Sequence, residues 1–172
     1  MVPEDNFPQY IVFDLDDSHY GISIESVIQV VHMVAITKIP ASPLWLAGLI
    51  GFRGRVIPVV NLRIRFGLQP ISFELNTPII ILQSGKQIAG LIVDTIEGVM
   101  PLRLDGMQTP ADMTIDAKFI STVTNQEEKV TIIPDIPKIL AGTRKYDSKL
   151  NPRRLVSKIN MVTDTRDDQQ KK

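Results

Sequence analysis

Short apolar runs separated by turn-forming Gly, Pro, Asn and Asp residues dominate most of the chain. Residues 10–15 lead into a polar turn at 16–18, and the run at 19–24 completes a predicted β-hairpin. An apolar run at 26–33 predicts the next strand. Further strands are predicted at residues 49–52, 56–60, 78–82, 87–94, 96–102, 119–124 and 129–133, with a short helix at 134–140. Many short strands with frequent breaks predict an all-β barrel or sandwich.

The segment at residues 48–68 predicts a complete strand–turn–strand–helix unit. Its two apolar runs flank Arg53-Gly54, where a Gly at the second central position suits a tight hairpin turn. Pro58 cannot donate a backbone hydrogen bond, so we expect its strand at a sheet edge or beside a bulge. Asn61 is expected to cap a short helix that ends before Gly67.

A faint internal duplication indicates two similar halves. Residues 21–30 share a pattern of Gly, aliphatic, acidic, hydroxyl and Val positions with residues 90–99, at an offset of 90 − 21 = 69. The preceding apolar runs keep the same offset. Chance similarity between short strands is the alternative. Duplication predicts two small subdomains packed together, approximately at residues 9–76 and 77–142.

Composition describes an ordinary water-soluble protein. The 172 residues are 44% hydrophobic, and no apolar stretch is long enough to span a membrane. The first ten residues lack the basic start and apolar core of a signal peptide, so we expect a cytoplasmic protein without membrane insertion. The absence of Cys excludes disulfides and thiolate catalysis and removes most types of zinc site.

The net charge of zero hides an asymmetry along the chain. Residues 143–172 contain nine Lys and Arg against four Asp, a net charge of +5, so residues 1–142 carry −5. We expect residues 143–172 to form a flexible basic tail, or one loosely docked through Leu150, Leu155 and Ile159. Residues 1–8 are expected to form an N-terminal arm, which leaves 9–142 as the folded part.

Residues that could carry catalysis or bind a metal are few. His19 and His32 are expected to be surface or packed histidines rather than metal ligands. The aspartates at 14–17 mimic a calcium loop, but they lack its Gly and its bidentate Glu. Asp94 and Glu97 could be drawn as a glycosidase pair, but nothing places them in a cleft. The sequence therefore predicts no catalytic residue, no metal site and no cofactor.

Four arginines in the 48–68 segment suggest contact with another macromolecule. Arg53, at a turn tip, and Arg63, flanked by apolar residues, are the better candidates for recognition, whereas Arg55 and Arg65 are expected to be solvated. A nucleic-acid-binding β-barrel is the alternative. Only 6% of residues are aromatic and residues 1–142 are net acidic, which disfavours nucleic-acid binding.

Motifs over residues 9–141 carry a resemblance to a known family. They include Tyr-Gly-Ile-x-Ile-x-x-Val from Tyr20, Gly-x-x-x-x-Arg-Gly-x-Val-Ile-Pro-Val-Val-Asn-Leu-Arg-x-Arg-Phe-Gly from Gly48, and Gly-Leu-Ile-Val-Asp from Gly90. In these motifs the chain resembles the CheW-like chemotaxis coupling proteins. The resemblance implies two SH3-like β-barrels around a shared core and no catalytic activity.

The resemblance also implies two partners and a contact surface. It implies that such a protein bridges a chemoreceptor cytoplasmic tip, held in a groove near the junction of the barrels, and the regulatory domain of a CheA-type histidine kinase. The chain has Gln29 where the family often has Glu, which weakens pairing with Arg53 and suggests a specialised adaptor. The residues expected to bind partners are Val27, Gln29, Val30, Arg53, Gly54, Arg63 and Ile64.

Overall fold

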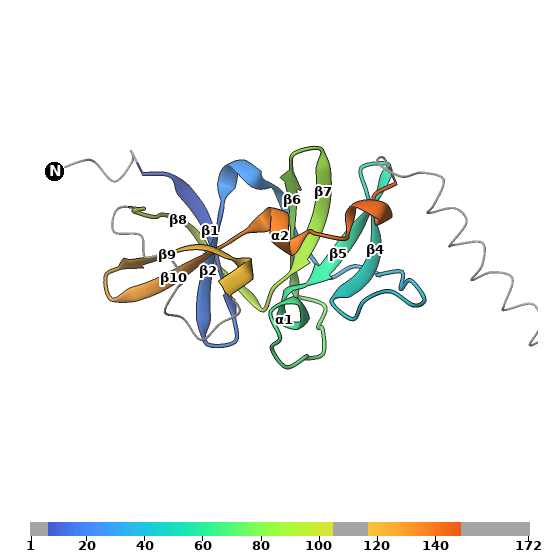
Figure 1. Ribbon diagram of the computed structural model, residues 1–172, viewed down its shortest axis with the longest axis horizontal. Helices are drawn as coiled ribbons and strands as arrows, with labels where there is room; N and C mark the ends of the chain where they lie inside the picture. The colour runs from blue at the N-terminus through green and yellow to red at the C-terminus, as the bar shows by residue number, and fades with distance from the viewer. Residues whose placement is uncertain (1–6, 105–116, 149–172) are drawn as a thin grey trace, which may run out of the picture.

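Ten strands form two five-stranded sheets in the computed structural model, which describes residues 7–104 and 117–148 (Figure 1). The fold is therefore mostly β, as the sequence predicted. The elements in chain order are β1 (Gln9–Leu15), β2 (Ser18–Ser23), η2 (Ile24–Ser26), β3 (Val27–His32), β4 (Leu46–Phe52), β5 (Arg55–Asn61), α1 (Leu62–Arg65), β6 (Pro78–Ser84), β7 (Gln87–Ile92), β8 (Thr95–Pro101), η4 (Ala117–Phe119), β9 (Ile120–Gln126), β10 (Lys129–Pro134), α2 (Ile136–Ile139) and η5 (Arg144–Tyr146).

The two sheets have the same topology. The first has the order β8-β1-β2-β10-β9 and the second has the order β3-β6-β7-β5-β4. Each contains a central hairpin, β1–β2 or β6–β7, and each joins that hairpin to one parallel neighbour, β10 or β5. Matching the first five strands of the chain with the last five reproduces one order from the other. This correspondence supports the internal duplication.

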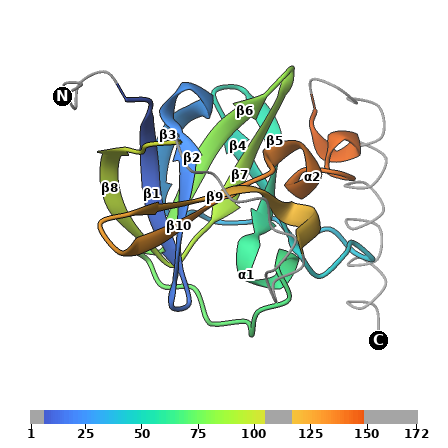
Figure 2. The ribbon, with the colours of Figure 1, turned by 60° about the vertical axis from the view of Figure 1, so that its left-hand side comes forward.

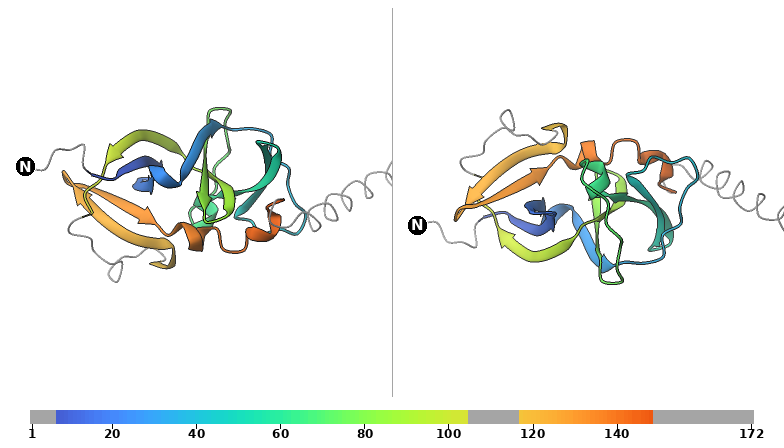
Figure 3. Two further views of the ribbon diagram at one scale, coloured as in Figure 1. Left: turned by 90° about the horizontal axis from the view of Figure 1, so that it is seen from above. Right: turned by 90° about the horizontal axis from the view of Figure 1, so that it is seen from below.

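The expected barrel boundaries at 9–76 and 77–142 are wrong, because each sheet takes strands from both halves of the chain. The first barrel consists of β1, β2, β8, β9 and β10, and the second consists of β3 to β7. After each central hairpin, the next strand crosses to the other sheet: β3 pairs with β6, and β8 pairs with β1. The two lobes lie side by side along the long axis (Figure 3).

Each sheet curls so that its two edges approach. In the second barrel, Thr37 and Leu49 exchange backbone hydrogen bonds of 2.9 Å, which links the chain after β3 to β4. In the first barrel, the Thr124 hydroxyl donates to the carbonyl of Arg103 at 2.6 Å, which links the chain after β8 to β9. The same closure in both barrels explains why each sheet forms a compact unit.

A shared hydrophobic core joins the barrels, as the resemblance implied. Phe13 and Tyr20 enter it from the first barrel, and Val60 and Leu82 enter it from the second. All four are almost fully buried, and burial of a large apolar side chain contributes about 1.5–3 kcal/mol. The short helices α1 and α2 lie beside this junction (Figure 2). The barrels are thus two sheets around one continuous core.

The structure confirms the local predictions for the 48–68 segment. The side chain of Asn61 accepts a hydrogen bond from the backbone N–H of Ile64 at 3.3 Å, so it caps α1. Gly67 has a φ of +77° just after the helix. Pro58 is not on an edge strand, since β5 lies between β7 and β4, but the pairing of β4 with β5 shifts between Leu46 and Gly48, directly beside Pro58, so the expected bulge is present. The missing N–H is also tolerated because pairing with β7 begins only at Val59.

The folded part extends beyond residue 142, so the expected start of the flexible tail at 143 is wrong. Thr143, Tyr146 and Asp147 are all buried. Ser148 exchanges hydrogen bonds with the backbone of Val56, at 2.8 Å and 3.0 Å. The remainder of the predicted tail and most of the N-terminal arm lie outside the described residues.

Candidate functional site

The turn between β4 and β5 places Arg53 and Gly54 at an exposed tip of the second barrel. Their φ angles are +47° and +75°, typical of the tight hairpin turn that favours Gly at the second position. The guanidinium of Arg53 donates a long hydrogen bond of 3.5 Å to the side-chain oxygen of Gln29. It also lies 5.0 Å from the ring centre of Phe52. These surface contacts leave Arg53 accessible to a partner.

The other predicted contact residues on β3 divide between two surroundings. β3 is an edge strand that pairs with β6 along one side. Val27 is half-buried and packs against the shared core, whereas Gln29 and Val30 are exposed. Gln29 contacts Arg53 at the turn, and Val30 lines a groove. The predicted contact residues of β3 therefore divide between two adjoining surface features.

A groove of about 630 Å³ lies where the two barrels meet. It runs between the end of β3, the loop at residues 71–77 and the start of β8, and its apolar lining includes Val30, Ile71 and Ile96. The loop beside it also exposes Leu75, whose exposed fraction is 88%. Apolar groups left in water at the junction of two subdomains are typical of a binding surface.

Arg63 does not lie on either surface, contrary to the sequence-based expectation. Its side chain is only 9% exposed. The guanidinium binds the carboxylate of Asp94 and lies 3.1 Å from that of Asp16, while Nε donates to the carbonyl of Gln69 at 2.7 Å. Arg63 is therefore a structural residue. Ile64, the next residue of α1, is half-buried.

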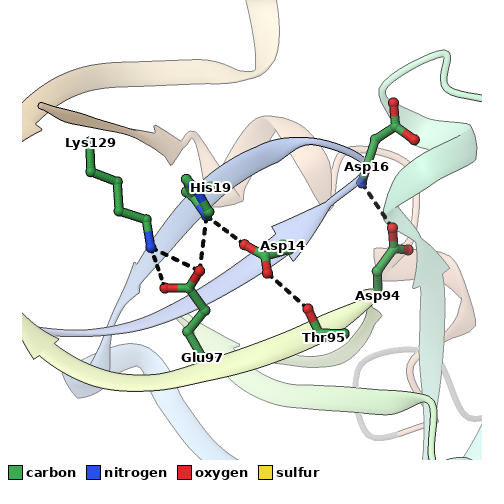
Figure 4. Close-up of polar contacts among 7 residues, drawn as sticks. All are labelled: Asp14, Asp16, His19, Asp94, Thr95, Glu97 and Lys129. Atoms are coloured by element: carbon green, nitrogen blue, oxygen red, sulfur yellow. Dashed lines mark hydrogen bonds and ion pairs between the residues drawn. The ribbon is translucent and has the colours of Figure 1, made fainter.

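The contacts of Arg63 clamp the two barrels together beside the groove. Asp94 lies between β7 and β8, and it accepts a hydrogen bond of 2.8 Å from the backbone N–H of Asp16 in the β1–β2 turn (Figure 4). Asp94 also lines the groove. One buried arginine thus ties α1, the first hairpin and the crossover into β8 to one another.

Arg65 is also held within the protein, although it was expected to be solvated. Its guanidinium lies 3.9 Å from the ring centre of Trp45. It donates to the carbonyls of Lys138 and Ala141 at 3.1 Å and 3.0 Å, at the end of α2. Burial lowers the pKa of Arg65 from its usual value. The residue joins the two short helices α1 and α2.

Arg55 forms an ion pair with the buried Asp147, so it is not solvated either. Three of the four arginines in the 48–68 segment therefore have partners inside the protein. They cannot together form a basic surface for phosphate groups, which requires exposed cations. The alternative of a nucleic-acid-binding barrel is not supported.

Two closed sheets around one core, with an apolar groove at their junction and an exposed arginine turn, define a scaffold-type protein that binds other proteins. A family model described as the CheW-like domain matches residues 9–144. The chain belongs to the CheW-like family. As a member of this family it is a non-enzymatic coupling adaptor of chemotaxis signalling.

Relatives and a solved structure agree with this assignment. The chain is 27% identical over 136 residues to the chemotaxis protein CheW of Klebsiella aerogenes, covering 78% of this chain and 82% of the relative. It is 29% identical over 148 residues to that of Treponema pallidum, covering 83% and 87%. The scaffolding protein TtCheW from Thermoanaerobacter tengcongensis superposes with a TM-score of 0.71 at 34% identity, covering 79% of this chain and 89% of that structure.

None of the helices in the described residues has the length and apolar character that a membrane span requires.

Proposed function

We propose that this chain couples a chemoreceptor cytoplasmic tip to the regulatory domain of a CheA-type histidine kinase. The observation that supports the proposal is the presence of an apolar groove and an exposed arginine turn on one protein with a shared core. The groove includes Val30, whereas the Arg53 turn contacts Gln29, the preceding residue of β3. Successive side chains of a strand point to opposite faces, so the groove and the turn lie on different faces of β3. Two partners that approach from these two faces can bind at the same time.

The groove is the proposed site for the receptor tip. A helix with its side chains is about 10–12 Å across, and the apolar side chains of Val30, Ile71 and Ile96 would contact its apolar stripe. Both barrels contribute to the groove, and the shared core fixes their relative position. Partner binding would then require no ordering of the groove walls, which lowers the cost of association.

The Arg53 turn is the proposed site for the kinase domain. Arginine at a turn tip presents a planar fork that can bind a carboxylate or a carbonyl pair bidentately. Gln29 offers only a neutral amide at 3.5 Å, so Arg53 is not neutralised by this neighbour. With these partners, the chain would act in the cytoplasm at membrane receptor arrays.

Two charge-introducing variants test the two surfaces separately. Val30→Glu should weaken binding of a receptor-tip hairpin, and Arg53→Glu should weaken binding of the kinase regulatory domain, each by about 1–3 kcal/mol in titration calorimetry. Val130→Glu is the control for the groove, since Val130 is a similarly exposed valine on β10. Lys86→Glu is the control for the turn, since Lys86 is exposed in the β6–β7 turn.

The pattern of affinity losses among the variants tests the assignment of the two surfaces. Each variant should affect one partner and keep the melting temperature of the wild-type chain, and the controls should affect neither partner. Unchanged affinity of both variants for both partners would show that the groove and the turn are not the binding surfaces.

A further inference from the structure

Four ionisable side chains converge at one end of the first barrel (Figure 4). Asp14, His19, Glu97 and Lys129 come from β1, β2, β8 and β10. Strand pairing brings them together, since His19 lies opposite Asp14 on one side and opposite Thr131 of β10 on the other. Their separation in the sequence gave no sign of this cluster.

The cluster belongs to the interior face of the barrel. His19 is two residues before Gly21 and therefore on the same face of β2. A Cβ atom at Gly21 would lie 3.1 Å from side-chain atoms of Leu102 and Ile133, which are inside the barrel. The side chains of the cluster are consequently half-buried rather than fully solvated, with exposed fractions of 22–40%.

A β-bulge directs Glu97 into the cluster. The pairing of β1 with β8 shifts between Phe13, opposite Ile96, and Val12, opposite Gly98, so Glu97 has no Cα partner. Bulges re-aim side chains and are frequent next to functional sites. Here the bulge places a carboxylate oxygen of Glu97 3.1 Å from Nδ1 of His19.

The arrangement has the donor set of a metal site. Nδ1 of His19 also lies 2.6 Å from a carboxylate oxygen of Asp14, and the three ligand atoms fall within 4.8 Å of one another. A ring nitrogen carries at most one proton, yet two carboxylates approach it. The other oxygen of Asp14 accepts a hydrogen bond of 2.9 Å from the Thr95 hydroxyl. Such outer hydrogen bonds orient metal-binding carboxylates.

We propose that Asp14, His19 and Glu97 bind a divalent transition-metal ion of the zinc class. One imidazole nitrogen and two carboxylate oxygens suit such an ion, and water can complete the tetrahedron. Ligand atoms about 2.0–2.1 Å from the metal lie about 3.3 Å apart in a tetrahedron. The observed spacings of 2.6 Å and 3.1 Å therefore need to widen by less than about 1 Å.

A cavity adjoins the cluster at His19. It has a volume of about 450 Å³ and is also lined by Lys129 and by residues of two turns, including Asp17, Glu127 and Glu128. These three exposed carboxylates outnumber the single charge of Lys129, and an excess of negative charge raises the local cation concentration.

Lys129 is the internal competitor of the metal. Its ammonium lies 2.6 Å and 2.9 Å from the two oxygens of Glu97. A metal on Glu97 would meet the repulsion of this positive charge. Removal of the charge should therefore strengthen metal binding, whereas removal of a ligand should weaken it. This opposite pair of effects distinguishes a metal site from a simple ion-pair network.

Titration of the full-length, chelator-treated chain with ZnCl2 tests the proposal. Calorimetry should show one equivalent of zinc bound by the wild type. His19→Gln and Asp14→Asn should weaken binding about tenfold or more, and Lys129→Gln should strengthen it roughly tenfold. His32→Gln is the matched control, because His19 and His32 are the only two histidines in the chain. Melting curves without zinc establish that each variant folds.

Imidazole NMR provides a second measurement on the wild-type chain. The ring signals of His19 should shift on zinc addition while those of His32 stay constant. Equal zinc affinity in the wild type and His19→Gln, loss of binding in His32→Gln, or zinc binding only after the Lys129 change would each overturn the proposal.

Discussion

Arg55 and Asp147, 92 residues apart in the chain, form a buried ion pair between β5 and the segment after α2. The guanidinium donates to a carboxylate oxygen of Asp147 at 2.6 Å, and Asp147 is fully buried. The same carboxylate accepts a weaker hydrogen bond of 3.4 Å from the backbone N–H of Ile88. Residues 143–148 are therefore a structural strap across the second barrel.

Replacing Asp147 with Ala should destabilise the protein. The change leaves the mostly buried guanidinium of Arg55 without its ion-pair partner, and breaking one side of a buried pair typically costs about 3–5 kcal/mol. Urea unfolding measures the loss, with Asp17→Ala as the control at an exposed aspartate. A chain ending at Gly142 should be similarly destabilised, and one ending at Ser148 should not. Equal unfolding midpoints for the two truncations would contradict the strap.

Replacing Arg63 with Met should loosen the joint between the barrels. The variant removes both ion pairs and leaves the carboxylate of Asp94, which is only 19% exposed, without its cation. We expect a loss of stability of about 3 kcal/mol and weaker binding of a receptor-tip hairpin, because Asp94 lines the groove.

A double-mutant cycle with Asp94→Asn separates this role from direct contact. The two changes should be strongly non-additive in stability, since the residues share one interaction. Additive effects would mean that the ion pair contributes little to the joint.

Replacing Gln29 with Glu should convert the long contact of Arg53 into an ion pair. Both residues are exposed, and exposed pairs contribute only about 0.2–1 kcal/mol. The gain in stability should appear at low ionic strength and disappear at high salt. Thermal melting of the two proteins at both salt concentrations measures this difference. A gain that persists at high salt would indicate a different origin.

Ionisation of Tyr20 should reduce the stability of the folded protein at alkaline pH. Its pKa is raised above the ordinary value, first by burial and then by the negative charge of Asp16. The neutral phenol is therefore favoured in the folded state. The contribution of the Tyr20 phenol to the free energy of unfolding is fully present below pH about 10, the ordinary pKa of an unfolded tyrosine. It is lost as the pH rises through the raised pKa of the folded state. Tyr20→Phe should show a shallower alkaline decline in denaturant unfolding than the wild type. Identical slopes would refute this assignment.

The positions of the strands followed from local signals, but their assignment to barrels did not. Asn61 and Gly67 marked the ends of α1 because caps depend on neighbouring backbone groups. The barrels depend on pairing between distant strands, such as β2 with β10, for which alternating apolar residues carry no partner information.

The difference between local signals and contacts of distant residues also explains why the surroundings of Arg53 were predicted correctly and those of Arg63 were not. Arg53 was placed correctly at an exposed turn, since Gly54 fixes the turn locally. The partners of Arg63 lie 31 and 47 residues away. Its apolar neighbours in the sequence signalled burial, and burial of a charged group implies a paired carboxylate. That signal could have indicated a structural arginine rather than a recognition residue.

The exchange of β3 and β8 between the sheets determines the order in which the chain can fold on the ribosome. All five strands of the second barrel lie within residues 27–92, so this sheet can pair completely before the rest of the chain is made. The hairpin β1–β2 precedes the second barrel in the chain, whereas its neighbours β8 and β10 follow that barrel. Contacts of such long sequence separation form slowly. The hairpin β1–β2 therefore lacks its sheet neighbours until β8 and β10 have been synthesised. During this time the apolar side chains of Phe13 and Tyr20 stay exposed until the second barrel packs against them.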